Sequence, residues 1–447
     1  MSEDAAWLRF LPEAIRSRIA GRRVLQAVIG NSGWLFLDKV IRLLSGVVVG
    51  VWLARYLGPQ QFGELNFAIA FVALFSPLAT LGLDAIVVRE LIRRPDDRGE
   101  ILGSAFSLKV LGASTGVVFV LVAIQLLRPA DDTMLWMVGI IAVGMIFQTF
   151  DVFDFWFQSQ VKSKFTVYVK GAAYMTCAIA KVVLILSDAA LVAFAWVAMV
   201  EIALGGVGLA AIYTQVEQRP PQYRLALWRW PKIRELLGSS WPLFLSGVAV
   251  MVYFRIDQVM IAQISGEKEV GLYSAALRLS EVWYTIPTVL VGSATPALIE
   301  AHGRSDELYY QRLQRVFTTL ARIAYVVAIP VSLLASVLVP LVYGEQFADA
   351  APILTIHIWT ALFVFLGIGL GPWMISEGMT RFYLWQTSAG AVANVVLNLF
   401  LIPRFGAVGA SVATLVSQIV ATYLAMSVLP KTRKIFYMET KALLLRG

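Results

Sequence analysis

The sequence predicts an all-α membrane protein with about 12 transmembrane helices arranged in two six-helix lobes. First, 59% of its 447 residues are hydrophobic and only 15% are charged, and the mean hydropathy of +0.74 is too high for a soluble protein. Second, apolar runs of about 20 residues, the length that crosses a bilayer, recur along the chain. Third, Lys and Arg gather on alternate loops between these runs, which is typical of multi-pass membrane proteins.

The order of apolar and basic stretches predicts the domain organisation. Twelve apolar segments have the approximate limits 31–54, 62–83, 101–127, 133–156, 165–187, 189–214, 239–264, 271–299, 316–341, 352–376, 381–402 and 406–429. The longest basic break, near the middle, contains Pro220-Pro221 and separates the sixth segment from the seventh. We therefore expect a cytoplasmic amphipathic N-terminal segment over 1–30, an N-terminal lobe over 31–216, a basic linker over 217–238, a C-terminal lobe over 239–430 and a basic tail over 431–447.

Loop charge predicts the orientation. Loops on one side are rich in Lys and Arg, as in the stretch 89–98, whereas the loops on the other side contain only Arg55, Arg128, Lys268 and Arg404. Because Lys and Arg accumulate in cytoplasmic loops, both termini and the central linker are expected in the cytoplasm.

Two matching loops indicate an internal repeat. Leu57–Asn66, between the first two segments, has the same glycine spacing as Ser265–Ser274, between the seventh and eighth. Both lobes begin on the same side, so the repeat is parallel and its pseudo-two-fold axis is expected along the membrane normal.

Charged residues at membrane depth are the candidate functional residues, because such residues are costly and normally face a bundle interior or a wet cavity. The first segment carries Asp38, Lys39 and Arg42, of which Asp38 and Arg42 share one helix face. A self-neutralised pair packed between helices is the alternative. The full set is Asp38, Lys39, Arg42, Lys109, Asp151, Asp154, Lys170, Lys181, Glu201, Arg255, Asp257, Arg278, Glu281 and Arg322.

Several short motifs resemble those of the O-antigen and polysaccharide flippase family, within the multidrug/oligosaccharidyl-lipid/polysaccharide exporter superfamily. They are Ala54–Pro59 with Phe62-Gly63, Ala79–Asp84 with Arg89-Glu90, and Ile402–Ser411. The resemblance covers nearly the whole chain. The related lipid II flippases have two further spans, for which this chain offers no room.

The resemblance implies two six-helix lobes around a central cationic cavity that rock between inward- and outward-open states. It further implies a polyprenyl-diphosphate-linked oligosaccharide as the substrate, moved across a bacterial inner membrane, with H+ or Na+ as a coupling ion. Membrane lipids, a polysaccharide polymerase and other assembly proteins are the further expected partners.

A diphosphate favours Arg forks and Lys point charges in a partly dry cavity. Arg42 and Arg255, in the opening helices of the two lobes, are the expected substrate-binding residues, supported by Lys39 and Arg278. Arg278 and Glu281 are three residues apart, so a pair along their own helix is an alternative for Arg278.

Three carboxylates, Asp38, Glu201 and Asp257, are candidates either for ion coupling or for charge balance of the cationic residues. Asp151 and Asp154 lie among aromatic residues, and the same pattern fits sugar binding or an ordinary aromatic belt.

No Walker phosphate loop, Ser-His-Asp arrangement or metal-ligand pattern is evident, so neither an enzyme nor a cofactor or metal is expected, and nucleic acid is not an expected partner. A cation or drug antiporter of the same superfamily is one alternative function, although it favours a more acidic cavity. A membrane-embedded glycosyltransferase or polymerase is another, although such an enzyme usually needs a large extramembrane loop or an acidic metal cluster.

Overall fold

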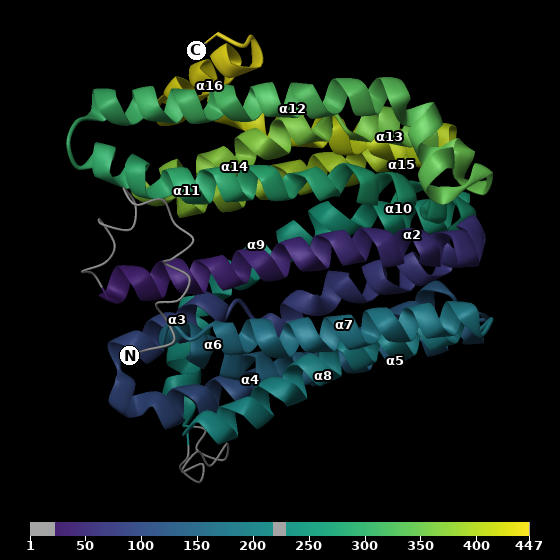
Figure 1. Cartoon of the computed structure of the whole chain (residues 1–447), viewed down its shortest axis with the longest axis horizontal. Coiled ribbons are helices and arrows are strands. Elements are labelled where there is room, and N and C mark those ends of the chain that lie inside the picture. Colours follow the sequence, from purple (N-terminus) through teal and green to yellow (C-terminus); the bar gives the residue numbers. More distant parts are fainter. Residues whose placement is uncertain (1–22, 218–228, 447) are drawn as a thin grey trace. The chain divides into compact units, whose positions relative to one another are not determined.

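The computed structural model describes residues 23–217 and 229–446, without the side chains of residues 23–41, 43, 44, 217 and 380. The described residues form helices joined by short turns, and no strand occurs among them (Figure 1). The prediction of an all-α fold is confirmed. The predicted amphipathic N-terminal segment lies mostly outside the described residues, as do residues 218–228 of the linker.

The first half of the chain contains α2 (Arg23–Thr80), α3 (Asp84–Arg93), α4 (Arg98–Leu127), α5 (Asp132–Phe147), α6 (Asp151–Ser159), α7 (Lys164–Leu186) and α8 (Leu191–Glu217). The second half contains α9 (Trp230–Ser265), α10 (Glu267–Glu281), α11 (Thr285–His302), α12 (Asp306–Tyr343), α13 (Ala351–His357), α14 (Thr360–Ser376), α15 (Thr380–Gln418) and α16 (Pro430–Leu443). Short 3-10 turns cover Pro95–Asp97, Gln148–Phe150, Val282–Tyr284, Glu345–Ala350 and Leu424–Ser427, and a π-helical turn covers Ile419–Tyr423.

Within the described residues, nine helices are long and apolar enough to cross a membrane, or ten if the pair bent by 48° between His357 and Thr360 is one span. Two of these helices are too long for one crossing. The 58 residues of α2 would extend about 87 Å if straight, against a hydrocarbon core of about 30 Å. Non-helical Gly58 in α2 and Gly406 in α15 break them, so each covers two of the twelve predicted segments.

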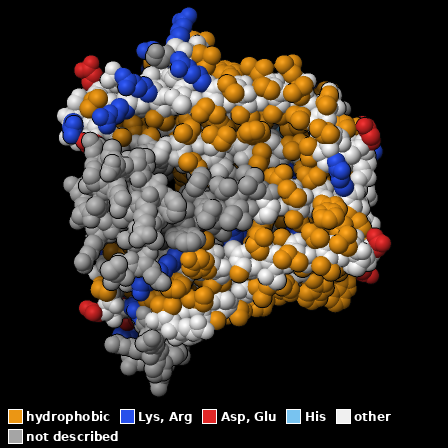
Figure 2. Space-filling model, viewed as in Figure 1, with side chains coloured by type: hydrophobic (Ala, Val, Ile, Leu, Met, Phe, Trp, Pro, Cys, Tyr) orange, Lys and Arg blue, Asp and Glu red, His pale blue; other side chains and the backbone are white. Residues whose placement is uncertain are grey.

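The exposed faces suit a lipid environment. Val326, Leu333 and Val337 of α12 are all more than half exposed. On the face shown in Figure 2, hydrophobic side chains cover the middle of the helices, and Lys and Arg gather near helix ends. We call the helix ends that carry the Lys- and Arg-rich loops the basic end.

The described chain divides into two compact units, whose limits differ from those of the predicted lobes. Unit 1 contains the chain up to Gly50 together with Phe75–Phe244, and unit 2 contains Val51–Leu74 together with the chain from Leu245. The middle of α2 thus joins unit 2, and the first residues of α9 join unit 1.

Polar contacts explain why Val51–Leu74 joins unit 2. The Arg55 guanidinium donates from Nε to the Val342 carbonyl oxygen at 2.7 Å and from Nη2 to that of Leu341 at 2.6 Å. Carbonyl groups at the end of a helix have no partners within it, so Arg55 caps the end of α12. The Phe62 ring also packs edge-on against that of Phe347, with centroids 6.0 Å apart.

The two repeated glycine loops pack against each other within unit 2. Gly58 (φ +67°) and Gly266 (φ +89°) share a positive φ that glycine adopts without strain. A methyl group on Gly63 would overlap the backbone carbonyl of Glu267, and one on Gly271 would overlap the carbonyl of Pro59. Equivalent positions therefore touch reciprocally, which is the pattern of a contact across a two-fold axis.

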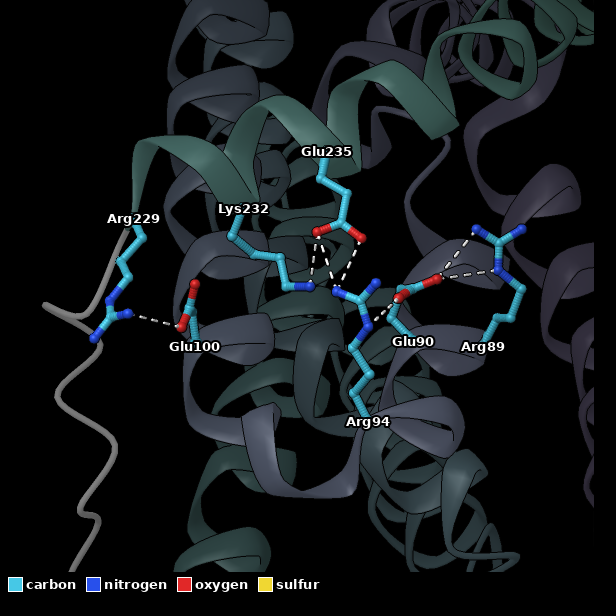
Figure 3. A network of polar contacts seen from close by, with 7 residues as sticks. All are labelled: Arg89, Glu90, Arg94, Glu100, Arg229, Lys232 and Glu235. Carbon is cyan, nitrogen blue, oxygen red and sulfur yellow. Dashed lines mark hydrogen bonds and ion pairs between the residues drawn. The ribbon is translucent and has the colours of Figure 1, made fainter.

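A network of ion pairs attaches the start of α9 to unit 1, at its basic end (Figure 3). Glu235 lies 2.9 Å from Lys232 and 3.1 Å from Arg94 of the chain after α3. Arg94 also approaches the buried Glu90, at 3.9 Å. The second part of the predicted linker is therefore helical and packed.

The predicted basic tail forms α16, which is likewise a packed helix. Ile435, Met438 and Ala442 are buried in the core of unit 2. The Gln314 side-chain amide of α12 donates to the Met438 carbonyl at 3.0 Å. Its basic side chains are exposed, and the apolar stripe of the helix packs within unit 2. The predicted cytoplasmic location of the tail stays a prediction.

Candidate functional site

A buried carboxylate in unit 2 is surrounded by neutral oxygen-bearing groups. Asp257, on α9, is 3% exposed. Its Oδ2 accepts hydrogen bonds from the Tyr273 hydroxyl at 2.7 Å and the Thr414 hydroxyl at 2.6 Å, and its Oδ1 accepts one from the Asn398 amide at 2.6 Å. No Lys or Arg of the described residues lies within ion-pair distance of Asp257.

Both an acceptor and a donor near Asp257 are left without a partner among the described residues. The Asn398 Oδ1 is buried and has no hydrogen-bond partner there, and the Asn394 Nδ2 is buried and unpaired as well. The Asn394 Oδ1 accepts from the Asn398 amide at 3.0 Å, and the Thr414 hydroxyl lies 2.9 Å from the Ala410 carbonyl oxygen. A carboxylate with amide, hydroxyl and carbonyl oxygens is the donor set that hard cations prefer.

A cavity of about 20 Å³ adjoins this group, which is room for one water molecule or one small ion. Its polar lining includes Asp257, Glu281, His357, Thr414 and Gln418. No group of three or more His, Cys, Asp or Glu that could hold a metal occurs in the described part of the chain. The cavity instead combines carboxylates with neutral oxygens.

Arg255 is half-buried on α9. Within the described residues, no carboxylate lies within 4 Å of its guanidinium. It is ten residues, or about 15 Å, from the end of α9 at Ser265. Arg255 also lies within the seventh predicted apolar segment, 239–264, which places it at membrane depth on that prediction. The positive charge of the Arg255 guanidinium acts electrostatically on the carboxylate of Glu281, which is on α10 of the same unit.

Arg278, on α10, contacts the middle part of α2. Its Nη2 donates to the Asn66 Oδ1 at 3.2 Å, and its guanidinium lies 5.0 Å from the centroid of the Phe62 ring. These contacts hold α10 against Val51–Leu74 within unit 2. A substrate role for Arg278 stays a prediction.

Arg42 belongs to unit 1, where its guanidinium lies over the Tyr174 ring, 5.1 Å from the centroid. The Tyr174 hydroxyl donates to the Arg42 carbonyl at 3.1 Å, which fixes α7 against α2. The side chains of Asp38 and Lys39 lie outside the described residues, so their predicted roles stay predictions.

Glu201, on α8, forms an ion pair with Lys181 of α7 at 3.1 Å. Both side chains are about one-quarter exposed. This geometry favours charge balance over ion coupling for Glu201, because its charge is already matched by a lysine.

Unit 1 contains a further charged group, which we call the unit 1 charged cluster: Asp84, Lys109, Asp151, Asp154 and Lys170. The Lys170 ammonium lies 2.8 Å from Asp151 and 3.4 Å from Asp154, and the Thr166 hydroxyl donates to Asp154 at 2.6 Å. Lys109 is fully buried, with its ammonium 4.9 Å from the centroid of the Phe155 ring.

Sequence reasoning identified the charged members of these groups except Asp84, which entered only as part of a family motif, and it missed the neutral groups around Asp257. One signal was present in the sequence: Asn394 and Asn398 are four residues apart in an apolar segment, which places two amides on one helix face.

The fold and the charges at membrane depth define a multi-pass α-helical membrane protein of the transporter class. A family model described as polysaccharide biosynthesis protein matches residues 28–302, more than half of the chain, and one described as MatE matches residues 242–400. The chain belongs to the polysaccharide biosynthesis protein family, within the multidrug/oligosaccharidyl-lipid/polysaccharide exporter superfamily.

Two relatives illustrate the range of similarity. A probable flippase AglR of Haloferax volcanii is 27% identical over 203 residues, which cover 43% of this chain and 41% of the relative. The chain thus spans about two fifths of the length of that relative. A capsular polysaccharide biosynthesis protein CapF of Staphylococcus aureus is 18% identical over 404 residues, which cover 88% of this chain and 97% of the relative.

Solved structures show the same fold. A lipid II flippase MurJ in an inward closed conformation has a TM-score of 0.72 at 13% identity, covering 92% of this chain and 91% of that chain. An inward-facing multidrug resistance transporter of the MATE family has a TM-score of 0.66 at 14% identity, covering 90% of this chain and 95% of that chain. These identities are too low to carry more than the fold.

Proposed function

We propose that the protein moves a polyprenyl-diphosphate-linked oligosaccharide across a bacterial inner membrane by alternating access. The family assignment supports a role in polysaccharide biosynthesis, and the relatives named above include a probable flippase and a lipid II flippase. A diphosphate headgroup is the charged part of such a substrate, so the protein must offer cations at membrane depth.

The observation that carries this proposal is Arg255. A guanidinium at membrane depth costs about 3 kcal/mol on insertion scales, and more where no carboxylate compensates it. Among the described residues no carboxylate lies within 4 Å of Arg255, and Glu281 acts on it only from a longer distance. An anionic substrate would supply a direct ion-pair partner for Arg255. Arg42, which belongs to unit 1, stays a separate predicted substrate-binding residue.

The oxygen-rich group around Asp257 is the proposed site of the coupling ion. Asp257 with its neutral oxygen neighbours, and a cavity of about 20 Å³ that Glu281 also lines, suit a single small monovalent cation, for which we propose Na+. Asp257 is two residues from Arg255 on the same helix, so a cation bound there would change the local field at Arg255.

Flipping of a fluorescent polyprenyl-diphosphate-linked glycan in proteoliposomes tests the proposal. Arg42→Gln and Arg255→Gln should each reduce the initial rate at least about tenfold, because a hydrogen bond to a charged group is worth roughly 1.5 to 3 kcal/mol. Arg255→Lys should recover part of the rate, because it keeps the charge and loses the fork.

Arg304→Gln is the matched control, since Arg304 is exposed and pairs with Glu300 at 2.6 Å outside the proposed site. Each variant must be reconstituted in equal amounts. Wild-type flipping rates in both Gln variants would remove the proposed headgroup site.

A further inference from the structure

We propose that the unit 1 charged cluster binds a neutral sugar of the lipid-linked glycan, because it presents the accessible Asp84, Asp151 and Lys170 beside the fully buried Lys109 ammonium, which has no hydrogen-bond partner among the described residues. This inference rests on the proposed function and assigns the glycan its own site in unit 1, separate from Arg255.

The cluster can be reached by a ligand. The Asp151 and Lys170 side chains are 29% and 32% exposed, and Asp84 is exposed as well. Asp84 begins α3, the helix that also carries Arg89 and Arg93, so the cluster lies toward the basic end of unit 1. On the positive-inside expectation this is the side from which the substrate is loaded.

The state of Lys109 distinguishes this cluster from an ion network in which every charged group has a partner. Its side chain is 0% exposed, and no hydrogen-bond acceptor for its ammonium occurs among the described residues. The charges that act on it most strongly are those of Asp151 and Asp84. A buried ammonium without acceptors is costly, and a ligand that brings an acceptor into the cluster removes part of that cost.

The chemistry of the cluster matches hydroxyl groups. An ionised carboxylate only accepts hydrogen bonds and an ammonium only donates them, whereas a hydroxyl does both. Neighbouring sugar hydroxyls can therefore donate to Asp151 and accept from Lys170, the two partly exposed members of the cluster. Three carboxylates against two ammonium groups leave the cluster formally anionic, which disfavours a diphosphate or an acidic sugar and favours a neutral one.

Two aromatic rings supply an apolar wall. Phe106 and Phe150 are both partly exposed, with ring centroids 5.7 Å apart, and Phe150 directly precedes Asp151. Small-molecule sites combine apolar and aromatic walls with a few polar groups that fix orientation. Asp151 and Asp154 thus belong to a charged cluster supported by aromatic rings.

The test compares dissociation constants for undecaprenyl diphosphate without sugar and for the same lipid carrying one N-acetylglucosamine or one galactose. Wild-type full-length protein in nanodiscs should bind at least one glycosylated lipid about tenfold more tightly than the bare lipid. Lys170→Met, Asp84→Asn and Lys109→Met should each bring that ratio close to one while the affinity for the bare lipid stays within about threefold. Free glucuronic acid, an acidic sugar, should not reduce the additional affinity that the neutral sugar gives to the lipid.

Lys181→Met is the matched control, because Lys181 is a lysine of the same helix, is also ion-paired, and lies outside the cluster. It should keep the wild-type ratio. Melting temperatures show whether each variant is folded. If Lys109→Met does not fold, Lys170→Met still tests the inference, because the Lys170 side chain is partly exposed.

The inference is overturned if the wild type binds the bare lipid and gains nothing from either sugar, or if the folded cluster variants keep the gain. Failure of the wild type to bind the bare lipid would instead remove the proposed function.

Discussion

At the scale of single residues, the distinction that matters is between matched and unmatched charge. Glu201 and Lys181 neutralise each other at 3.1 Å, whereas Asp257 is surrounded by hydroxyl and amide groups and Arg255 lacks a carboxylate within ion-pair distance among the described residues. A charge that the fold leaves unmatched is costly to keep, so a ligand is the expected source of its partner.

Asp257→Asn should therefore abolish the dependence of flipping on a Na+ gradient, since the amide removes the negative charge that holds the cation. Glu201→Gln should retain that dependence. The measurement is the initial flipping rate in proteoliposomes with and without an imposed Na+ gradient. Unchanged gradient dependence in the Asp257→Asn variant would assign Asp257 to a structural role.

Glu439 on α16 is buried at 0% exposure, and neither of its carboxylate oxygens has a hydrogen-bond partner in the described chain. Burial raises the pKa of Glu439 well above its ordinary value of 4.5. The folded state therefore binds the proton more tightly than the unfolded state. Packing of α16 is strongest below pH 4.5 and weakens as the pH rises through the raised pKa.

Glu439→Gln should slow amide hydrogen exchange in α16 at pH 7 to 8, after correction for intrinsic rates, because the amide needs no proton to be neutral. The advantage should disappear near pH 4.5. Glu300→Gln, at an exposed ion pair, provides the comparison and should show no such pH dependence. An equal effect of Glu439→Gln at both pH values would contradict the assignment.

At the scale of elements, the two repeated glycine loops pack backbone against backbone at Gly63 and Gly271, where a side chain would not fit. Gly63 and Gly271 each lie against the backbone that follows the first glycine of the other loop. The repeat was recognised in the sequence from glycine spacing, but only the fold shows that the two copies touch.

Gly63→Ala and Gly271→Ala should each destabilise the protein by about 1 to 3 kcal/mol, because the added methyl group would overlap backbone rather than a side chain that can move aside. Gly292→Ala is the control, since nothing lies within 4 Å of the methyl position. It should be neutral or stabilising by up to about 1 kcal/mol. Thermal unfolding in detergent measures the difference, and equal melting temperatures for the three variants would exclude the overlap.

At the scale of the whole molecule, the orientation predicted from loop charge can be tested by labelling. Cys177 is buried, so a Cys177→Ala background allows single cysteines to be introduced one at a time. Cysteines at Ser2, Gln222 and Gly447 should stay unlabelled by a membrane-impermeant maleimide in intact cells, whereas those at Ser187 and Lys268 should react. Labelling at Gln222 in intact cells would reverse the predicted sidedness of the linker.

The amino-acid sequence by itself determined the all-α membrane class, the approximate segments and the two loops that match. These follow from local quantities, namely the length of apolar runs, loop charge and glycine spacing, which do not depend on what packs against what. Ala54–Pro59 and the other family motifs pointed to the same superfamily that the family models identify.

The tertiary structure alone decided which segments pack together and which charges are matched. Val51–Leu74 joins unit 2 and Trp230–Phe244 joins unit 1 because Arg55 and Glu235 find partners far away in the sequence. Asp257 acquires its oxygen-rich surroundings from α10 and α15, and Lys109 is buried beside the cluster without an acceptor. Such contacts join residues that are many positions apart in the sequence. A local sequence pattern therefore cannot show which group lies next to a buried charge.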